Sequence, residues 1–414
     1  MKVMWLGHNL AYPPKGGALQ RNYNLLREIA RKCEVHVVAF DQPVTRPDNV
    51  TPQDCIKALS KFCASVEWVN LSSSSSLRRT RYGLAFAGLM TGEPYDFAWL
   101  RSAEMTDKLK KIVERVSPHV VHVDTLGLAQ YLPSIGSSGR VLNHHDVESS
   151  KIELRAQKTR NMLLRSYFKI EARKLAAAER RWCPKFDVNA VVSEDEGHVL
   201  AQACPGLKIC VVPNGVDTEY FTPRADPGTH TILFCGSMDM HPNQEAMEYF
   251  LRQIWPRVVA QAPDVNLLIV GRKPPTWLNE VVRTDHRIQV TGFVDDVRPY
   301  FQKAAVCICP ILSGGGTRLK ILDSLAMGVP VVATSFAASG LSLEHGKHLL
   351  LADTEQQFAE DIRRLLTTPA LRSELASAGS KRVDQLYSWT VVGQTLLDTY
   401  DLACHRSVRA THQA

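Results

Sequence analysis

Short apolar runs alternate with longer amphipathic stretches along the chain. The runs at 3–6, 35–40 and 120–123 are nearly continuous in apolar residues, as buried parallel strands are. Between the first two, residues 18–31 carry their apolar positions at helical spacing. The alternation predicts an α/β protein whose parallel sheets are covered by helices.

The opening of the chain is repeated near its middle. Residues 3–7 read VMWLG and residues 232–236 read ILFCG, each an apolar run that ends in glycine. At 414 residues the chain is too long for one ordinary core. Two similar domains are therefore expected. The polar stretch at 41–76, which includes the serine run 72–76, is interpreted as a surface loop or insertion.

A glycine loop lies between a strand and a helix in the second half. Residues 313–316 read SGGG, Thr317 is a candidate N-cap, and a helix is predicted from Leu319 to Gly328. Such a loop offers free N–H groups and the positive end of a helix dipole to an anion.

Charged residues follow this loop directly. Arg318 and Lys320 add two cations in the first turn, and Asp323 offers carboxylate oxygens of the kind that bind ribose hydroxyls. These residues suit a phosphate site with a sugar-hydroxyl contact beside it. They equally suit an ordinary strand-to-helix turn with solvated basic side chains.

This stretch resembles the donor site of GT-B glycosyltransferases of family four (group 1). Residues 316–332 read GTRLKILDSLAMGVPVV, and many members carry GTRLKILEAMAxGxPVV. Residues 213–217 (PNGVD) and 289–296 (QVTGFVDD) resemble further family segments in the same order. Residues 91–95 (TGEPY) resemble, more narrowly, the sugar transferases of bacterial exopolysaccharide systems.

The resemblance implies a GT-B architecture, in which two Rossmann-like, doubly wound domains face one another across a cleft. Residues 1–205 would form the acceptor-side domain, with a C-terminal helix at 388–414 packing back on it. Residues 206–387 would form the domain that binds the nucleotide-sugar donor.

The resemblance also implies functional residues. The candidate catalytic residues are His145, which follows the strand at 140–142 and would orient the transferred sugar, together with Lys320 and Asp323. His144 is the neighbour that could replace His145 in this role. The candidate donor-binding residues are Gly16, Gly17, Asn214, Gly236, Ser237, Arg272, Phe293, Val294, Gly315, Gly316, Thr317, Arg318 and Leu319.

Two departures from the family pattern affect the donor site. Most members have an Arg and a Lys shortly after the glycine at 236, where this chain has Ser237 and Met238. The usual first Glu of the family is Gly315 here. The donor sugar is therefore left open, and Arg318 and Lys320 become candidates to take over phosphate binding.

Composition limits the partners and the localisation. The net charge of +7 suits anionic ligands without indicating a nucleic-acid-binding protein. None of the ten cysteines forms a CxxC pair, so buried reduced thiols are expected rather than zinc sites or disulfides. With no signal-like N-terminus and no apolar run of about 18 residues, the protein is expected to be cytoplasmic.

A basic stretch could bring the protein to a membrane. Residues 151–185 contain 11 Lys or Arg and three Glu at spacings that predict long helices. They suit peripheral contact with an anionic membrane at the inner face of the cytoplasmic membrane, where a lipid-linked acceptor would be found. A plain solvated helical face explains the same pattern.

The function implied by the resemblance is that of a retaining, metal-independent glycosyltransferase. It would move a sugar from a nucleotide diphosphate-sugar, most simply a UDP- or GDP-sugar, to a glycan, lipid-linked or small-molecule acceptor. No other cofactor and no metal are expected. A nucleotide-sugar epimerase and a non-catalytic GT-B-like scaffold are the alternatives. A nicotinamide oxidoreductase fits less well because the chain lacks a GxGxxG fingerprint after its first strand.

Overall fold

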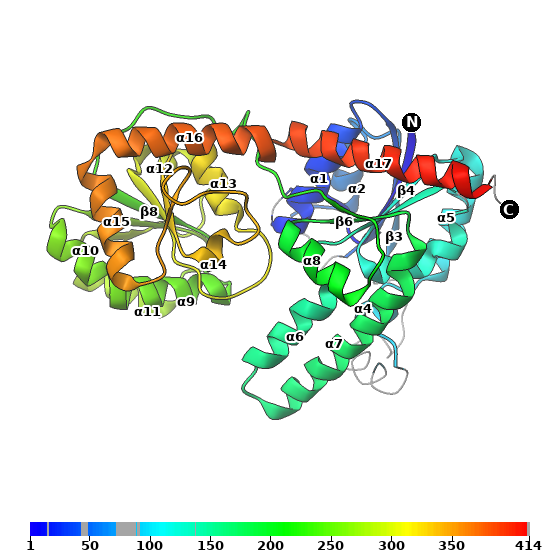
Figure 1. The fold of residues 1–414 in the computed structure, drawn as a ribbon, viewed down its shortest axis with the longest axis horizontal. Coiled ribbons are helices and arrows are strands. Elements are labelled where there is room, and N and C mark those ends of the chain that lie inside the picture. The colour runs from blue at the N-terminus through cyan, green and yellow to red at the C-terminus, as the bar shows by residue number, and fades with distance from the viewer. Residues whose placement is uncertain (15, 43–48, 72–87, 89–91, 137, 412–414) are drawn as a thin grey trace. The chain divides into compact units, whose positions relative to one another are not determined.

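The computed structural model describes residues 1–14, 16–42, 49–71, 88, 92–136 and 138–411 (Figure 1). The chain divides into two units. Unit 1 contains Met1–Pro213 and Val392–Ala414, and unit 2 contains Asn214–Val391. The sequence-based boundaries were drawn after residues 205 and 387.

Unit 1 is built on a parallel sheet of seven strands in the order β3-β2-β1-β4-β5-β6-β7. The strands are β1 (Lys2–Gly7), β2 (Glu34–Asp41), β3 (Ser65–Asn70), β4 (Val120–Asp124), β5 (Gly139–Asn143), β6 (Val188–Val191) and β7 (Ile209–Val211). The chain runs outward from β1 in one direction and from β4 in the other. The pair β1/β4 is therefore the topological switch point, where ligands bind in such sheets.

Helices cover the sheet of unit 1, as the sequence pattern requires. They are α1 (Gly17–Ile29), α2 (Pro52–Leu59), α4 (Tyr95–Trp99), α5 (Ala103–Val116), α6 (Glu148–Lys158), α7 (Met162–Trp182) and α8 (Glu194–Ala203), with 3-10 turns η4 (Leu126–Ser134) and η5 (Cys183–Lys185). From Val392 onward, helix α17 (Trp389–Thr411) belongs to this unit. The hydroxyl of Tyr400 on α17 shares a 3.0 Å hydrogen bond with Nδ1 of His122 on β4.

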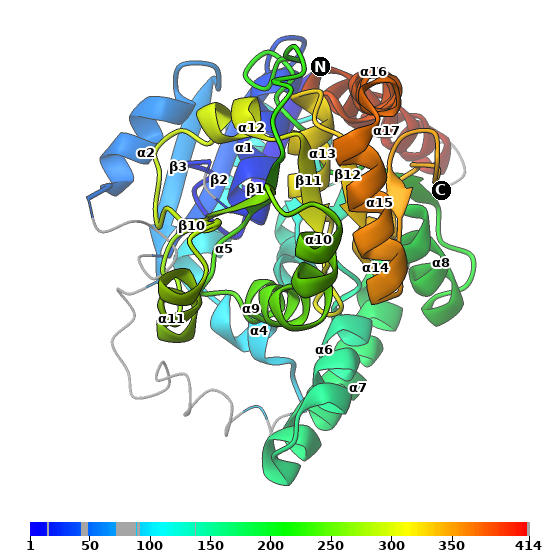
Figure 2. The same cartoon turned by 90° about the vertical axis from the view of Figure 1, so that its left-hand side faces the viewer.

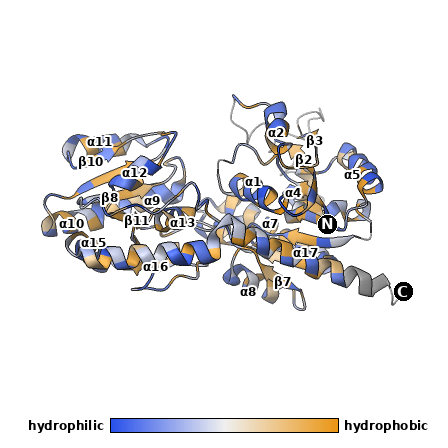
Figure 3. Cartoon of the chain, turned by 90° about the horizontal axis from the view of Figure 1, so that it is seen from above, coloured by the Kyte–Doolittle hydropathy of each residue, from blue (hydrophilic) through white to orange (hydrophobic). Residues whose placement is uncertain are grey.

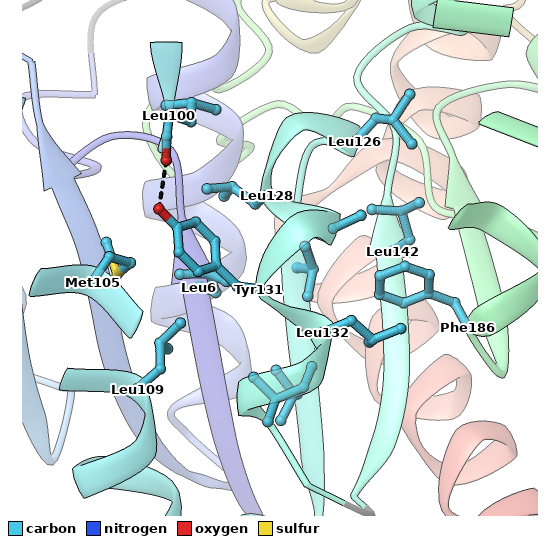
Figure 4. Packing of buried hydrophobic residues seen from close by; sticks show 14 of the residues in the cluster. Leu6, Leu100, Met105, Leu109, Leu126, Leu128, Tyr131, Leu132, Leu142 and Phe186 are labelled. Atoms are coloured by element: carbon cyan, nitrogen blue, oxygen red, sulfur yellow. Dashed lines mark hydrogen bonds between the residues drawn. The ribbon is translucent and has the colours of Figure 1, made fainter. Parts of the chain in front are cut away.

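The core of unit 1 lies between this sheet and its helices. Leu6 of β1, Leu109 of α5 and Leu132 of η4 pack together there (Figure 4). The hydroxyl of Tyr131 donates a hydrogen bond to the carbonyl oxygen of Leu100 at 2.5 Å, so that this buried polar atom has a partner.

Unit 2 repeats the design with six parallel strands in the order β10-β9-β8-β11-β12-β13. The strands are β8 (Thr231–Cys235), β9 (Asn266–Val270), β10 (Ile288–Val290), β11 (Val306–Cys309), β12 (Val331–Ala333) and β13 (Leu350–Leu351). Its helices are α9 (His241–Tyr249), the π-helical η6 (Phe250–Ile254), α10 (Trp255–Gln261), α11 (Thr276–Thr284), α12 (Arg298–Lys303), α13 (Leu319–Ala326), α14 (Ser335–Ala338), α15 (Glu355–Thr367) and α16 (Pro369–Tyr387). Here β8 and β11 form the switch point.

The predicted α/β class, with two doubly wound parallel sheets, is confirmed. The strands are largely hydrophobic, whereas the helices present polar residues on one side (Figure 3). In the part of the chain that the structure describes, no helix is long and apolar enough to span a membrane.

The interpretation of residues 41–76 as a loop was wrong, because α2 and β3 lie within it. Thr51 and Asp54 form a capping box at the start of α2, and Pro52 occupies the first turn. Strand β3 is only half-buried at one end of the sheet, so its sequence lacks a continuous apolar run. The serine run itself lies outside the described residues.

Candidate functional site

The candidate donor-binding residues of unit 2 gather at the carboxyl ends of four neighbouring strands. Gly236 and Ser237 follow β8, Arg272 follows β9, Phe293 and Val294 follow β10, and the loop with residues 315–319 follows β11. Because these strands are parallel and adjacent, the residues share one edge of the sheet. Asn214 joins them by donating a 3.0 Å hydrogen bond from its side chain to Oγ1 of Thr317.

Lys320 lies at the switch point of this sheet. Its Nζ donates a 2.7 Å hydrogen bond to Oδ1 of Asn243 and stands 4.2 Å from the ring centroid of Phe234. Burial lowers the pKa of Lys320 below its usual value. Among the described residues this bond to Asn243 is the one hydrogen bond found for the partly buried ammonium group, which leaves donor capacity for an anion.

Two glycines allow close approaches at this edge of the sheet, one of them to the lysine. A Cβ atom on Gly236 would lie 2.6 Å from Nζ of Lys320, and one on Gly271 would lie 1.8 Å from the carbonyl oxygen of Gly236. The backbones at the ends of β8 and β9 therefore approach each other more closely than any larger residues allow.

Asp323 lies one turn beyond Lys320 on α13. Burial raises the pKa of its carboxyl group to about 7. Its Oδ1 is buried and has no hydrogen-bond partner among the described residues. An unsatisfied buried acceptor costs about 1–3 kcal/mol, so this atom is suited to receive a hydrogen bond from a ligand hydroxyl.

The predicted N-cap at Thr317 was wrong. Helix α13 begins at Leu319, and Arg318 occupies the N-cap position without a capping side-chain hydrogen bond. The oxygen that would have capped the helix instead accepts the hydrogen bond from Asn214. The loop reaches the helix through Gly314 and Gly316, whose φ angles of 104° and 76° favour glycine.

Arg318 turns back onto the glycine loop. Its guanidinium donates to the carbonyl oxygens of Gly315 at 2.6 Å and Gly314 at 3.0 Å, and also to that of Gly316. Here this cation fixes the loop conformation, whereas Lys320 supplies the buried positive charge.

A carboxylate that the sequence did not indicate borders the same loop. Glu245 on α9 accepts a hydrogen bond from the hydroxyl of Ser313. Nearby, Nε of Arg272 donates to Oγ of Ser237 at 2.7 Å, and its guanidinium pairs with Asp239 at 3.3 Å. Phe293 is 62% exposed.

In unit 1, three side chains meet at the carboxyl ends of β1, β4 and β5, which are adjacent strands. Nε2 of His145 lies 2.8 Å from Oδ1 of Asp124, and Nδ1 of His8 lies 2.7 Å from Oδ2 of the same carboxylate. The sequence indicated His145 alone. His8 and Asp124 were missed because only the strand order shows that they flank the switch point.

Asp124 is completely buried and yet ionised. Burial by itself would raise its pKa, but the charges and hydrogen bonds of His145 and His8 hold the pKa well below its usual value. Side-chain amides of Asn143 and Asn22 donate further hydrogen bonds at 2.9 and 2.5 Å. The carboxylate therefore fixes both imidazole rings, as the orienting carboxylate of a catalytic histidine does.

The same trio is a candidate metal site. One ligand atom from each of His8, Asp124 and His145 lies within 4.8 Å of the others. Two imidazoles and a carboxylate can hold a divalent transition metal. The hydrogen bonds between them give the arrangement an equally good explanation without one.

His144 and His145 differ sharply in environment. His144 is buried, and its Nε2 lies 3.1 Å from Oδ1 of Asn189. Burial lowers the pKa of His144 to about 4. The side chain of His145 is 21% exposed, so of the two it is the one that a ligand can reach.

Gly16 and Gly17 stand at the start of α1 in unit 1. Gly16 has φ of 95°, which favours glycine. A Cβ atom on either residue would meet no atom within 4 Å, so the backbone here is open to a ligand.

A second buried carboxyl group lies near the histidine cluster. Glu148 opens α6, and its Oε1 accepts a 2.6 Å hydrogen bond from Oγ1 of Thr125. Burial, followed by the charge of Asp96, raises the pKa of Glu148 to about 8. Thr125 has φ of 108°, a strained value for a β-branched residue and one that is found mostly at functional sites.

Comparison with known families identifies the family of this chain. The family described as "Glycosyltransferase Family 4" matches residues 15–220, and "Glycosyl transferases group 1" matches residues 229–368. The chain belongs to the family 4, group 1 glycosyltransferases.

Curated relatives of this glycosyltransferase match it over part of their length. An uncharacterized 44.6 kDa protein in the cps region of Klebsiella pneumoniae is 27% identical over 139 residues, which are 32% of this chain and 36% of that protein. A phosphatidyl-myo-inositol mannosyltransferase of Mycolicibacterium smegmatis is 30% identical over 200 residues, 46% of this chain and 51% of the relative. The alignment thus spans about half of the mannosyltransferase.

Solved structures resemble the glycosyltransferase over nearly its whole length. Sucrose-phosphate synthase of Thermosynechococcus elongatus has a TM-score of 0.69 at 17% identity, covering 99% of this chain and 100% of that one. HepE of Anabaena, in complex with UDP, has a TM-score of 0.65 at 15% identity, covering 97% and 100%. At these identities the likeness establishes the fold.

The buried Glu148 predicts a pH-dependent loss of stability. From about pH 5 to pH 8 the unfolded chain has released this proton while the native state retains it, so rising pH lowers the free energy of unfolding. Glu148→Gln removes this contribution and should gain stability over the parent as the pH rises. Melting midpoints measured across this pH range check the prediction, with the exposed Glu114→Gln as control. Parallel pH profiles for Glu148→Gln and the parent would contradict it.

Proposed function

We propose that this protein is a retaining glycosyltransferase that needs no divalent metal. It moves a sugar from a nucleoside diphosphate-sugar to a glycan, lipid-linked or small-molecule acceptor in cell-surface polysaccharide or glycoconjugate synthesis. The observation that carries the proposal is the partly buried cation Lys320 beside a glycine loop at the switch point of unit 2. A solved structure of similar fold supports the substrate class, because HepE has been crystallised with UDP-glucose.

The donor diphosphate would bind to unit 2. Breaking the bond between sugar and phosphate leaves negative charge on the diphosphate. Lys320 and the free N–H groups at the start of α13 would stabilise that charge electrostatically. The unpartnered Oδ1 of Asp323 would accept a hydrogen bond from a ribose hydroxyl.

His145 would orient the transferred sugar, and Asp124 would act as a positioning residue that fixes its ring. The acceptor oxygen would bond to the anomeric carbon on the face from which the diphosphate leaves. The diphosphate would depart with the bonding electrons and take up the acceptor proton. The product would therefore keep the anomeric configuration of the donor.

A thermal-shift screen against UDP, GDP, ADP and TDP, each with and without EDTA, tests the donor site. A ligand at 100 times its dissociation constant stabilises by about 2.7 kcal/mol, which is readily seen as a shifted midpoint. We expect one nucleotide to shift the midpoint equally with and without EDTA. A shift that EDTA abolishes would overturn metal independence, and no shift with any of them would favour a scaffold.

Lys320→Ala should weaken binding of that nucleotide at least tenfold, because a charge-assisted hydrogen bond is worth about 1.5–3 kcal/mol. Gly236→Ala should have a similar effect, since its Cβ would displace the ammonium group. Gly197→Ala is the matched control, because its Cβ would make only ordinary contacts at 3.5 Å. Calorimetric titration checks all three variants. Unchanged affinity in Lys320→Ala would remove this residue from the site.

His145→Ala should lower turnover while leaving nucleotide affinity within about twofold, because this residue is assigned to the sugar. Asp124→Asn should lower turnover less, and by a factor that depends on pH, because the amide no longer fixes the imidazole. Steady-state rates with the donor found in the screen check both. If His144→Ala lost turnover equally without loss of thermal stability, the assignment of His145 would be wrong.

A further inference from the structure

Helices α6 and α7 form a hairpin that projects away from the sheet of unit 1 (Figure 1 and Figure 2). The helices pack against each other, and residues 159–161 join them. Arg155 of α6 lies over the ring of Phe168 of α7, 4.4 Å from its centroid. Beyond this contact the hairpin presents its tip to solvent.

The tip is apolar, which is unusual for a solvated turn. Met162 and Leu163, the first two residues of α7, are 81% and 84% exposed, and Leu164 is 52% exposed. Among the described residues, no other three consecutive large hydrophobic residues are all exposed. Leu163 also begins a line along α7 with Tyr167 and Ile170, at i, i+4 and i+7 spacing.

Basic residues surround this apolar tip. Residues 151–170 contain six Lys or Arg and one Glu. Arg160, Arg165 and Lys169 are exposed, and no ion pair to another described residue is found for them. Apolar side chains ringed by cations match the chemistry of an anionic bilayer surface, where the apolar groups enter the acyl boundary and the cations meet lipid phosphates.

We propose that the tip of the α6–α7 hairpin docks on an anionic phospholipid membrane, with Met162 and Leu163 inserted below the headgroups. This surface uses none of the candidate site residues of unit 2. It would hold the protein at the surface where a lipid-linked acceptor is found. Of the two explanations of the basic stretch at 151–185, the proposal favours membrane contact over a plain solvated helical face.

Vesicle flotation with the full chain tests the proposal. The protein should float with vesicles that contain phosphatidylglycerol, and much less with phosphatidylcholine alone or at high salt, because the Debye length falls from about 8 Å at 0.15 M to about 3 Å at 1 M. Arg160→Glu with Arg165→Glu should weaken binding at least tenfold. Lys110→Glu with Lys111→Glu, the same charge change on the exposed face of α5, is the matched control and should have a smaller effect.

The apolar part is tested separately. Met162→Asp with Leu163→Asp should abolish flotation, whereas Leu402→Asp, at a residue 40% exposed on α17, should not. Tryptophan introduced as Leu163→Trp should be quenched by lipids brominated in the acyl chain. All these variants should keep the parent melting midpoint and its shift with nucleotide, so failure here is distinguishable from failure of the donor site.

Three results would overturn the proposal. One is the absence of flotation with any vesicle, and another is equal flotation of the tip variant and the control. The third is self-association of the chain through the apolar tip. In that case the parent would be a dimer by light scattering, the tip variant would be a monomer, and neither would float.

Discussion

The proposed donor site of unit 2 depends on one partly buried ammonium group, that of Lys320. Taking the Lys320 side chain out of water disfavours its charged form, and this is why its pKa is lowered. The amide oxygen of Asn243 and the ring face of Phe234 offset part of that cost. Asn243 is itself fixed, because its amide nitrogen donates to the carbonyl oxygen of Ser237 at 2.7 Å. An anion would complete the environment of the lysine.

Unit 1 has a buried charge of the opposite sign at the switch point of its sheet. There the buried charge is the carboxylate of Asp124, and two imidazoles and two amides surround it. In both units the charge lies where the strand order reverses, so the repeated topology places a cation in one sheet and an anion in the other. The carboxylate is stabilised within its own unit, which suits a positioning role. The lysine keeps capacity for a ligand.

Much of this arrangement could be predicted from the sequence. The buried strands have continuous apolar runs. The glycine loop before α13 and the length of its family pattern predicted a donor site there, which stays a prediction. Strand β3 and helix α2 were missed because the first lies at the end of the sheet and the second is short and polar, although Thr51, Pro52 and Asp54 carry a local helix-start signal.

The remaining residues depend on tertiary structure. His8, Asp124 and Glu148 are far apart in sequence, and only the order of the strands brings the first two beside His145. Glu245 contacts the glycine loop from another helix, so no spacing within the loop could reveal it. The start of α13 at Leu319 was predicted correctly, but its N-cap was not, because the hydroxyl of Thr317 is engaged by Asn214, a contact that the local sequence does not encode.

We propose above all that Lys320 binds the diphosphate of the donor. A crystal structure of the protein with the nucleoside diphosphate that stabilises it most tests this directly. We expect a phosphate oxygen within hydrogen-bonding distance of Nζ of Lys320, and a ribose hydroxyl hydrogen-bonded to Asp323. A diphosphate bound elsewhere, with Lys320 still bonded only to Asn243, would contradict it.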